Sequence, residues 1–505
     1  NNLALSSRLS KYHGILDAAR EPGRASRRCH GVGRACSIEV SPRLACKPLL
    51  PPKMWLQAIA AFLLAVSSHA LTTTTQQRPV QALQTFLDGV LKESAARVAT
   101  DGDGQLQLAL TKNIRRGDCV IEVPLDACVT ADRARNMPWL AAAEDNAGEE
   151  WDPWCGDASL LAACLLRDNL PEEWISSLPQ DLWLPLLDTN EPPSCSARDL
   201  GALRENAADD AQWLADHTGE TWDDFPLALA WVVSRSVEVP EVGLCLAPGL
   251  DLIDHDDLLD PFEEDLLCEL GPRGPGGIQL PGKKTVRFLA PEDRSKGDKL
   301  VASYGALPAA AYLERYGFLP RTGAARRFAA TAELRFELRE DDRFIDDKLN
   351  LLYLNGAIDG EEVDDGFVEA CLGGEPDPEV LRFLRLSLLE GADAFLLEPI
   401  FANEVWDHLG APISRENEAA VIQAVSDEAA AAREGMLDET IGIYEQLRSA
   451  ELDALEATQR WADAEVLALP AKEYYQERRL KSLGLDTEWD EDEGNQWSGS
   501  RGAAW

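Results

Sequence analysis

The side chains of this chain best suited to chemistry lie in three short segments between residues 251 and 318. Tyr304 follows an apolar stretch at residues 300–303, Tyr316 begins a Tyr-Gly-Phe sequence, and His255 ends the sequence Asp-Leu-Ile-Asp-His about fifty residues before Tyr304. A phenol and an imidazole can each donate and accept hydrogen bonds, whereas a carboxylate only accepts them. These groups could align a polar substrate. Each also has a structural interpretation: Tyr304 as a half-buried tyrosine, and residues 254–257 as an exposed acidic turn.

Histidine and cysteine usage argues against several other chemistries. Beyond residue 70 the chain has only His217, His255 and His408, which leaves little room for a histidine-based nucleophile triad or a two-histidine metal site. The 11 cysteines include no Cys-X-X-Cys or Cys-X-Cys pair, so we expect no zinc site and no metal. Their scatter does not resemble a disulfide framework and favours a reducing compartment.

The charge balance argues against a nucleic acid as the main partner. The 505 residues include 48 Lys and Arg against 88 Asp and Glu, which gives a net charge of −40. Because binding to phosphates needs a basic surface, we expect no nucleic-acid partner. The acidic excess is typical of solvated faces and would suit basic protein partners.

The first 79 residues are expected to lie outside the folded part. Residues 1–53 carry ten basic and three acidic residues, and we interpret them as an over-extended gene model or a basic presequence. After Met54, an apolar run at 55–66 leads to small residues, the pattern of a signal peptide. The run is too short for a membrane span, and a hydroxyl-rich, transit-like stretch follows it. Residues 54–79 therefore predict delivery to a plastid, with the secretory pathway or the cytoplasm as alternatives.

Hydrophobic periodicity predicts the elements that position these residues. Residues 80–130 and 244–305 contain short apolar strands, whereas residues 131–235 have the three-to-four-residue spacing of helices. From about residue 340 the chain is again helical, and residues 486–505 form an acidic tail that we expect to be disordered. The sequence thus predicts an α+β fold, in which a β-rich domain is split by a helical insert and followed by an all-α C-terminal domain.

The order of these motifs resembles the SET-domain family of the Rubisco large-subunit lysine methyltransferase (Rubisco LSMT). The matching sequences are Asn113-Ile114-Arg115-Arg116-Gly117-Asp118, Ser176-Ser177-Leu178-Pro179, Ser234-Arg235, Asp251 to His255, Ser303-Tyr304-Gly305, Tyr316-Gly317-Phe318, Glu404-Val405-Trp406 and Asn417-Glu418. The resemblance implies a SET domain at residues 80–320, with its insert at about 131–235. It also implies a helical substrate-binding domain at residues 321–485.

The resemblance further implies a cofactor and a set of site residues. The family uses S-adenosyl-L-methionine to methylate lysine side chains of proteins, and we expect a non-histone protein as acceptor. By position, Tyr304 would be the catalytic tyrosine and Tyr316 would help to wall the lysine channel. The cofactor site would be lined by Ser234, Arg235, Asp251, Asp254, His255, Gly104 and Leu106. The C-terminal helical domain would dock the protein substrate, and we expect the chain to be a monomer.

The chemistry of lysine methylation explains why such residues are needed. A lysine amine has a pKa of about 10.4 and is mostly charged at neutral pH, and the charged form cannot attack a methyl group. A narrow aromatic channel desolvates the amine and the cofactor's sulfonium repels its charge, so both lower the pKa of the amine. Tyrosine hydroxyls and backbone carbonyls can then align the lone pair at about 3 Å from the methyl carbon. Arg235 could bind the carboxylate of the cofactor.

Three positions depart from the family pattern. Asp254 stands where the family usually has asparagine, Pro308-Ala309 stand where it often has Ser-Asn, and Gly104 lies in a poorly matching version of the glycine-containing cofactor loop. An ionised aspartate accepts hydrogen bonds but cannot donate one as asparagine does. Two alternatives therefore stand beside the lysine methyltransferase. One is a catalytically weak or inactive SET-fold protein-binding module, and the other is a protein-histidine methyltransferase.

Overall fold

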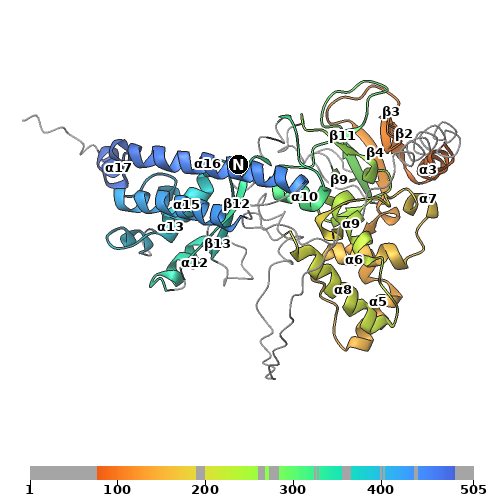
Figure 1. Ribbon diagram of the computed structural model, residues 1–505, viewed down its shortest axis with the longest axis horizontal. Helices are drawn as coiled ribbons and strands as arrows, with labels where there is room; N and C mark the ends of the chain where they lie inside the picture. Colours follow the sequence, from red (N-terminus) through yellow and green to blue (C-terminus); the bar gives the residue numbers. More distant parts are fainter. Residues whose placement is uncertain are drawn as a thin grey trace, which may run out of the picture.

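The computed structural model of the chain has two bodies, which Figure 1 shows next to each other. It describes residues 77–188, 200–259, 268–271, 284–339 (without 324, 325, 327 and 328), 341–354, 366–398, 401, 404–436 and 442–483. The basic extension at 1–53, nearly all of the targeting segment at 54–79 and the acidic tail at 486–505 lie outside these residues. One body holds the orange-to-green elements up to helix α10, and the other holds the teal and blue elements.

The first body begins with helix α3 (Gln77–Val90) and is built on several small sheets. Leu83 and Leu87 of α3 are four residues apart, so they share one helix face, and both are buried in the β core. The four-stranded sheet has the order β1 (Glu93–Ser94), β4 (Cys119–Pro124), β10 (Thr285–Leu289) and β9 (Cys268–Gly271). Beside it, β2 (Ala96–Thr100) pairs antiparallel with β3 (Leu106–Leu110).

The helical insert lies between β5 (Val129–Thr130) and β6 (Val237–Val239), which flank β7 (Gly243–Leu246) in one sheet. Its helices are α4 (Ala131–Arg135), α5 (Pro138–Ala147), α6 (Asp157–Arg167), α7 (Glu172–Ile175), α8 (Ala202–Thr218) and α9 (Phe225–Arg235). Helices α6 and α9 are apolar over most of their surface and are correspondingly buried, packed against each other. The end of α9 delivers Ser234 and Arg235 to the junction with β6.

A two-residue parallel pairing joins the distant segments that carry the candidate chemistry. Strand β8 (Asp254–His255) pairs with β11 (Val301–Ala302), with Val301 opposite Asp254 and Ala302 opposite His255. Tyr304 lies two residues after the end of β11, and helix α10 (Ala309–Tyr316) then carries Tyr316 at its last position. This pairing places the Asp-His segment beside the tyrosine, although about fifty residues separate them along the chain.

The second body is mainly helical and also contains a two-stranded antiparallel sheet that was not anticipated from the sequence. The sheet is formed by β12 (Ala332–Glu337) and β13 (Phe367–Leu372). Leu334 and Phe336 alternate into the core with the two-residue period of a strand. The helices are α12 (Ile345–Leu354), α13 (Pro378–Ser387), α14 (Val405–Leu409), α15 (Arg415–Gly435), α16 (Ile443–Ala468) and α17 (Tyr475–Ser482).

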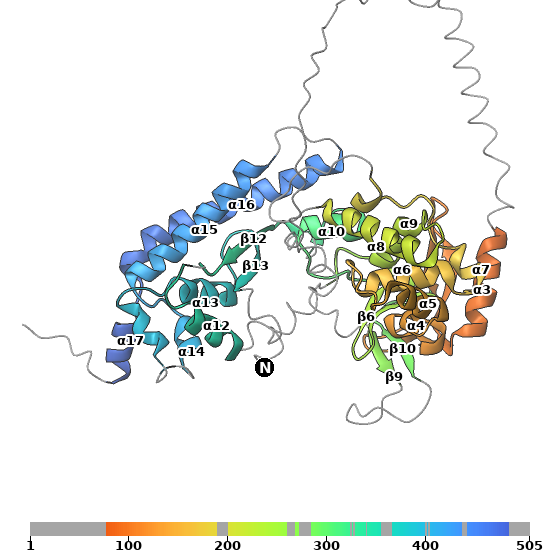
Figure 2. The ribbon, with the colours of Figure 1, turned by 90° about the horizontal axis from the view of Figure 1, so that it is seen from below.

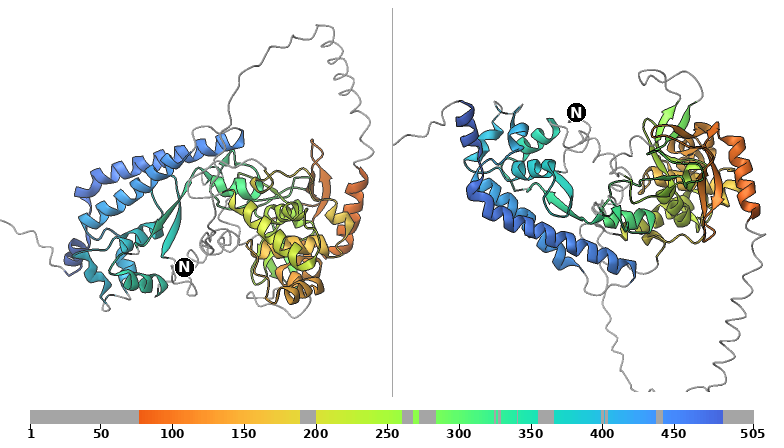
Figure 3. Two further views of the ribbon diagram at one scale, coloured as in Figure 1. Left: turned by 60° about the horizontal axis from the view of Figure 1, so that its bottom comes forward. Right: turned by 90° about the horizontal axis from the view of Figure 1, so that it is seen from above.

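Helix α16 connects the two bodies. It runs beside α15 in Figure 3 and extends beyond the second body toward α10 in Figure 2. Tyr444 and Leu447 of α16 are buried in one apolar cluster with Tyr312 of α10. The ring of Tyr444 also lies edge-on to Trp183 of the insert, at 5.9 Å between centroids. Within the described part of the chain, none of the helices has both the length and the apolar character that crossing a membrane requires.

Candidate active site

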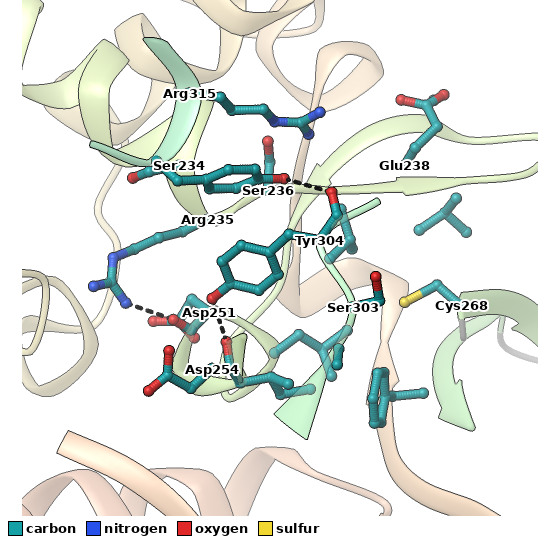
Figure 4. A pocket seen from close by; sticks show the side chains of 18 of the residues that line it. Ser234, Arg235, Ser236, Glu238, Asp251, Asp254, Cys268, Ser303, Tyr304 and Arg315 are labelled. Atoms are coloured by element: carbon teal, nitrogen blue, oxygen red, sulfur yellow. Dashed lines mark hydrogen bonds between the residues drawn. The ribbon is translucent and has the colours of Figure 1, made fainter. Parts of the chain in front are cut away.

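A pocket of about 540 Å³ lies where α9, β6, the 3-10 turn Leu250–Leu252, β11 and α10 meet. Tyr304 stands in the middle of this pocket in Figure 4. Arg235, Asp251 and Asp254 lie near the hydroxyl end of its ring, whereas Arg315 lies on the other side. The pocket therefore has two charged ends, separated by an aromatic side chain.

Hydrogen bonds hold Tyr304 by its side chain and by its backbone. The Tyr304 hydroxyl donates to the carbonyl oxygen of Ile253 at 2.8 Å, and its backbone N–H donates to Nδ1 of His255 at 3.2 Å. Its carbonyl oxygen accepts from the hydroxyl of Tyr316 at 3.5 Å. Burial, with smaller contributions from Asp254 and Tyr316, raises the pKa of Tyr304 well above its ordinary value. The side chain is therefore a neutral phenol at physiological pH.

Aromatic rings surround Tyr304. Its ring centroid lies 4.4 Å from that of Tyr316, 5.0 Å from that of His255 and 6.3 Å from that of Phe318. These separations are in the range of favourable aromatic contacts. The hydroxyl of Tyr312 donates to the Gly305 carbonyl at 2.6 Å and fixes the turn after the tyrosine. The result is a wall of rings that limits the access of water.

His255 supports Tyr304 from behind and is itself held by an acidic residue. Only 5% of its side chain is exposed, and its Nε2 lies 3.0 Å from Oδ1 of Asp257. Burial lowers the pKa of His255, although the carboxylate of Asp257 opposes this effect. A neutral ring with its proton on Nε2 can face Asp257 and accept the Tyr304 N–H at Nδ1. His255 does not line the pocket, and its contact to the site is through the tyrosine backbone.

Asp251 and Arg235 join the 3-10 turn to the end of α9. The buried carboxylate of Asp251 accepts the N–H of Gly249 at 2.7 Å and Nε1–H of Trp174 at 3.3 Å. Burial raises the pKa of Asp251, although Arg235 opposes the shift. Arg235 donates through Nη1 to the Asp251 carbonyl at 2.6 Å, and its buried Nε has no hydrogen-bond partner among the described residues. Arg235 itself lines the pocket and brings a guanidinium to this end of it.

Asp254 lies at the same end of the pocket and is paired with a lysine. Its carboxylate forms an ion pair with Nζ of Lys299, and about half of its side chain is exposed. Its Oδ1 also accepts the N–H of His255 at 2.8 Å. The negative charge that stands in place of the asparagine usual in the family is therefore balanced within the site.

The pocket gathers most of the residues that the sequence suggested. The lining includes Ser234, Arg235, Asp251, Asp254, Tyr304 and Tyr316. His255, Gly104 and Leu106 do not line it. Gly104 lies in the turn between β2 and β3, and Leu106 begins β3. Their assignment to the cofactor stays a prediction.

Most of the other lining residues were not assigned to the site from the sequence, and three of them are informative. Phe318 was part of a quoted motif, so its signal was available. Arg315 directly precedes Tyr316, but an arginine in the last turn of a helix is also typical of a charge that favours the helix dipole. Leu182 comes from the insert, and nothing local in the sequence indicates that it reaches the pocket.

Comparison with known sequences agrees with this architecture. Residues 339–440 match the family model for the Rubisco LSMT substrate-binding region. The chain is 33% identical over 282 residues to the chloroplastic ribulose-1,5 bisphosphate carboxylase/oxygenase large subunit N-methyltransferase of Nicotiana tabacum, covering 52% of this chain and 55% of that protein. It is 27% identical over 445 residues to the protein of that name from Pisum sativum, covering 80% and 86%. A chloroplastic [fructose-bisphosphate aldolase]-lysine N-methyltransferase of Arabidopsis thaliana is 31% identical over 283 residues, covering 52% and 55%. The chain thus spans about half the length of the tobacco and Arabidopsis relatives.

Comparison with solved structures identifies the fold. The SET domain of LSMT bound to lysine and AdoHcy superposes with a TM-score of 0.62 at 21% identity, covering 83% of this chain and 99% of that one. Rubisco LSMT bound to AdoMet gives a TM-score of 0.57 at 22% identity, covering 81% and 97%. At this level of identity the likeness shows the fold alone.

Proposed function

We propose that the chain belongs to the SET-domain family of Rubisco LSMT and that it is an S-adenosylmethionine-dependent protein-lysine N-methyltransferase acting on a non-histone protein. The observation that carries the proposal is the setting of Tyr304. A neutral phenol two residues after β11 is fixed by His255, lies in ring contact with Tyr316 and lines a pocket that also contains Arg235. The names of the relatives support this activity.

Tyr304 would orient the acceptor amine and would not remove its proton. Its raised pKa makes the phenolate scarce near neutral pH. Because its O–H donates to Ile253, the lone pairs of its oxygen can accept an N–H of the amine. An amine held by one N–H presents its own lone pair in a fixed direction, which is the alignment that a near-attack geometry needs.

The aromatic wall would favour the neutral amine. Tyr316 and Phe318 surround the site of the acceptor with apolar surface, and removal of water disfavours the charged ammonium and lowers the pKa of the amine. We propose that Ser234, Arg235 and Asp254 hold the cofactor, since the guanidinium of Arg235 lies at that end of the pocket and suits the carboxylate of the cofactor. S-adenosylmethionine would supply a methyl group already activated on a sulfonium sulfur.

The second body would bind the acceptor protein. The match to the substrate-binding model covers residues 339–440, which include α12 to α15. We propose that this region docks a folded protein while the pocket receives one of its lysines, and that the chain works as a monomer. The chloroplastic relatives and the signal-plus-transit pattern of residues 54–79 support a plastid location.

The test is methyl transfer by the full chain to two probe proteins, the Rubisco large subunit and fructose-bisphosphate aldolase. We expect transfer from labelled S-adenosylmethionine to a lysine. We expect Tyr304→Phe to lower kcat by about 10²–10³, the usual loss when one aligned polar group is removed from an active site. Tyr353→Phe is the matched control, because Tyr353 is an exposed tyrosine of α12.

Three results would contradict this function. A Tyr304→Phe variant as active as wild type would exclude the orienting role. Mass spectrometry that places the methyl group on histidine would favour the histidine methyltransferase. Calorimetry that detects no binding of S-adenosylmethionine to the wild-type chain would favour a SET-fold protein-binding module.

A further inference from the structure

Arg315 is a charged residue of the pocket to which the proposed reaction gives no role. It lies in the last turn of α10, immediately before Tyr316, and lines the pocket. Its Nε donates to the carbonyl oxygen of Val233 at 3.2 Å, and its guanidinium carbon lies 5.3 Å from the centroid of the Tyr316 ring. These contacts hold the guanidinium between the ends of α9 and α10.

The position of Arg315 is on the acceptor side of the pocket. In Figure 4, Arg235, Asp251 and Asp254 lie at the hydroxyl end of Tyr304, and Arg315 lies across the rings from them. Because we assign the Arg235 end to the cofactor, a ligand group that meets Arg315 would belong to the acceptor.

Arg315 lies outside the ion pairs that the described part of the chain forms around the pocket. Two basic residues earlier in the chain are paired: Arg294 with Asp256 at 2.8 Å, and Lys299 with Asp254. Arg315 has no such ion pair among the described residues, and its Nη atoms are not used by the bond to Val233. The guanidinium is half-buried, and its planar fork fits a carboxylate.

We propose that Arg315 is a specificity-determining residue that binds the carboxylate of an aspartate or glutamate next to the acceptor lysine. This inference rests on the proposed function for the identity of the acceptor. It adds a sequence preference that the reaction itself does not require.

Glu238 is the residue that would compete with an acidic substrate side chain for Arg315. It lines the same side of the pocket as Arg315 in Figure 4. Its carboxylate repels an incoming acid and attracts the guanidinium, so it should weaken the preference for an acidic neighbour. The variant Glu238→Gln should therefore sharpen the preference that Arg315 creates.

The test compares binding of short synthetic peptides to the full chain by fluorescence anisotropy, with S-adenosylhomocysteine present. Each peptide has one central lysine in an alanine background and a single Glu, Gln or Lys at one neighbouring position. We expect the wild-type chain to bind the Glu peptide roughly tenfold more tightly than the Gln peptide at one of these positions, as a charge-assisted hydrogen bond would give.

The variants separate charge from packing. Arg315→Gln should reduce the preference to less than about twofold, Arg315→Lys should keep part of it, and Arg315→Glu should favour the Lys peptide instead. Arg460→Gln changes an exposed arginine of α16 and should keep the wild-type preference. The urea midpoint of each variant shows whether it is folded.

The inference would be overturned if the wild-type chain bound Glu and Gln peptides equally, bound no peptide, or if a folded Arg315→Gln variant kept the preference. Methyl transfer to the same peptides is measured in parallel. Selective binding without transfer would contradict the methyltransferase function and still support the role of Arg315, so the two failures are distinguishable.

Discussion

At the scale of single residues, the ion pair between Asp254 and Lys299 compensates a departure from the family pattern. Lys299→Met would leave the carboxylate of Asp254 unbalanced at the cofactor end of the pocket. Because both side chains are partly exposed, we expect only a two- to fivefold loss of S-adenosylmethionine affinity, about 0.5–1 kcal/mol. Adding Asp254→Asn should restore the affinity in calorimetric titrations. Unchanged binding by Lys299→Met would show that the pair has no role there.

The buried His255 should make stability depend on pH. Because burial lowers its pKa, the unfolded chain takes up a proton near pH 6.5 while the folded chain resists it. The free energy of unfolding should therefore fall as the pH decreases below about 6.5. Urea denaturation of His255→Asn between neutral and mildly acidic pH should show a smaller fall. Equal slopes for variant and wild type would contradict the buried neutral imidazole.

Pocket residues that belong to sequence motifs could be assigned to the site from the sequence. Residues that reach the pocket only through the packing of distant elements could not. Tyr304, Tyr316 and Arg235 belong to motifs and line the pocket. His255 also belongs to a motif, but it contacts Tyr304 from behind through the β8–β11 pairing. Arg315 faces the pocket because α10 packs against α9, and the spacing of residues within α10 alone does not indicate its partner.

At the scale of elements, the end of α10 is fixed by close approach to the insert. Gly317 has a φ of +74°, and a Cβ there would meet the Trp183 carbonyl oxygen at 2.2 Å. Gly219 ends α8 with a φ of +72° and has open space around it. Gly219→Ala should cost about 1 kcal/mol of backbone strain. Gly317→Ala should cost about 1–3 kcal/mol more and lower peptide affinity, because Tyr316 must shift.

Urea denaturation of the two variants measures how much stability each glycine substitution costs, and Gly219→Ala is the control for Gly317→Ala. Equal losses of stability would show that Trp183 moves away from the new Cβ without loss of stability.

The strand pairings were the elements least predictable from sequence. Two residues of β8 are too few to show a period, whereas the long helices α15 and α16 were expected from their apolar spacing.

At the scale of the whole molecule, Leu447 links the two bodies. It is fully buried with Tyr312, whereas Leu455, further along α16, is buried within the second body. Replacement of either leucine by alanine should cost about 2–5 kcal/mol of stability. Only Leu447→Ala should also lower methyl transfer to a short peptide, since α10 carries Tyr316. Thermal unfolding and peptide kinetics together check this. Equal effects of the two variants on kinetics would contradict the link.

The sequence predicted a β-rich part with a helical insert and a helical part after it, because strand-length apolar segments give way to the three-to-four-residue spacing of helices. The contact between the parts was not, because Tyr444 and Leu447 have the ordinary spacing of any helix core. Their burial depends on Tyr312, more than a hundred residues earlier in the chain.

The reach of α16 has a consequence for building chimeras from this chain and its relatives. Exchange of residues 339–440 alone would transplant the region that matches the substrate-binding model, and it would keep the native α16 against α10 with a foreign α15 packed on α16. A graft that begins at the same point but runs to the end of α16 would put a foreign helix against α10, which carries Tyr316 of the pocket. On the proposed function, a hybrid cut before Tyr444 should change the choice of protein acceptor and keep the native contact between α16 and α10 beside the pocket.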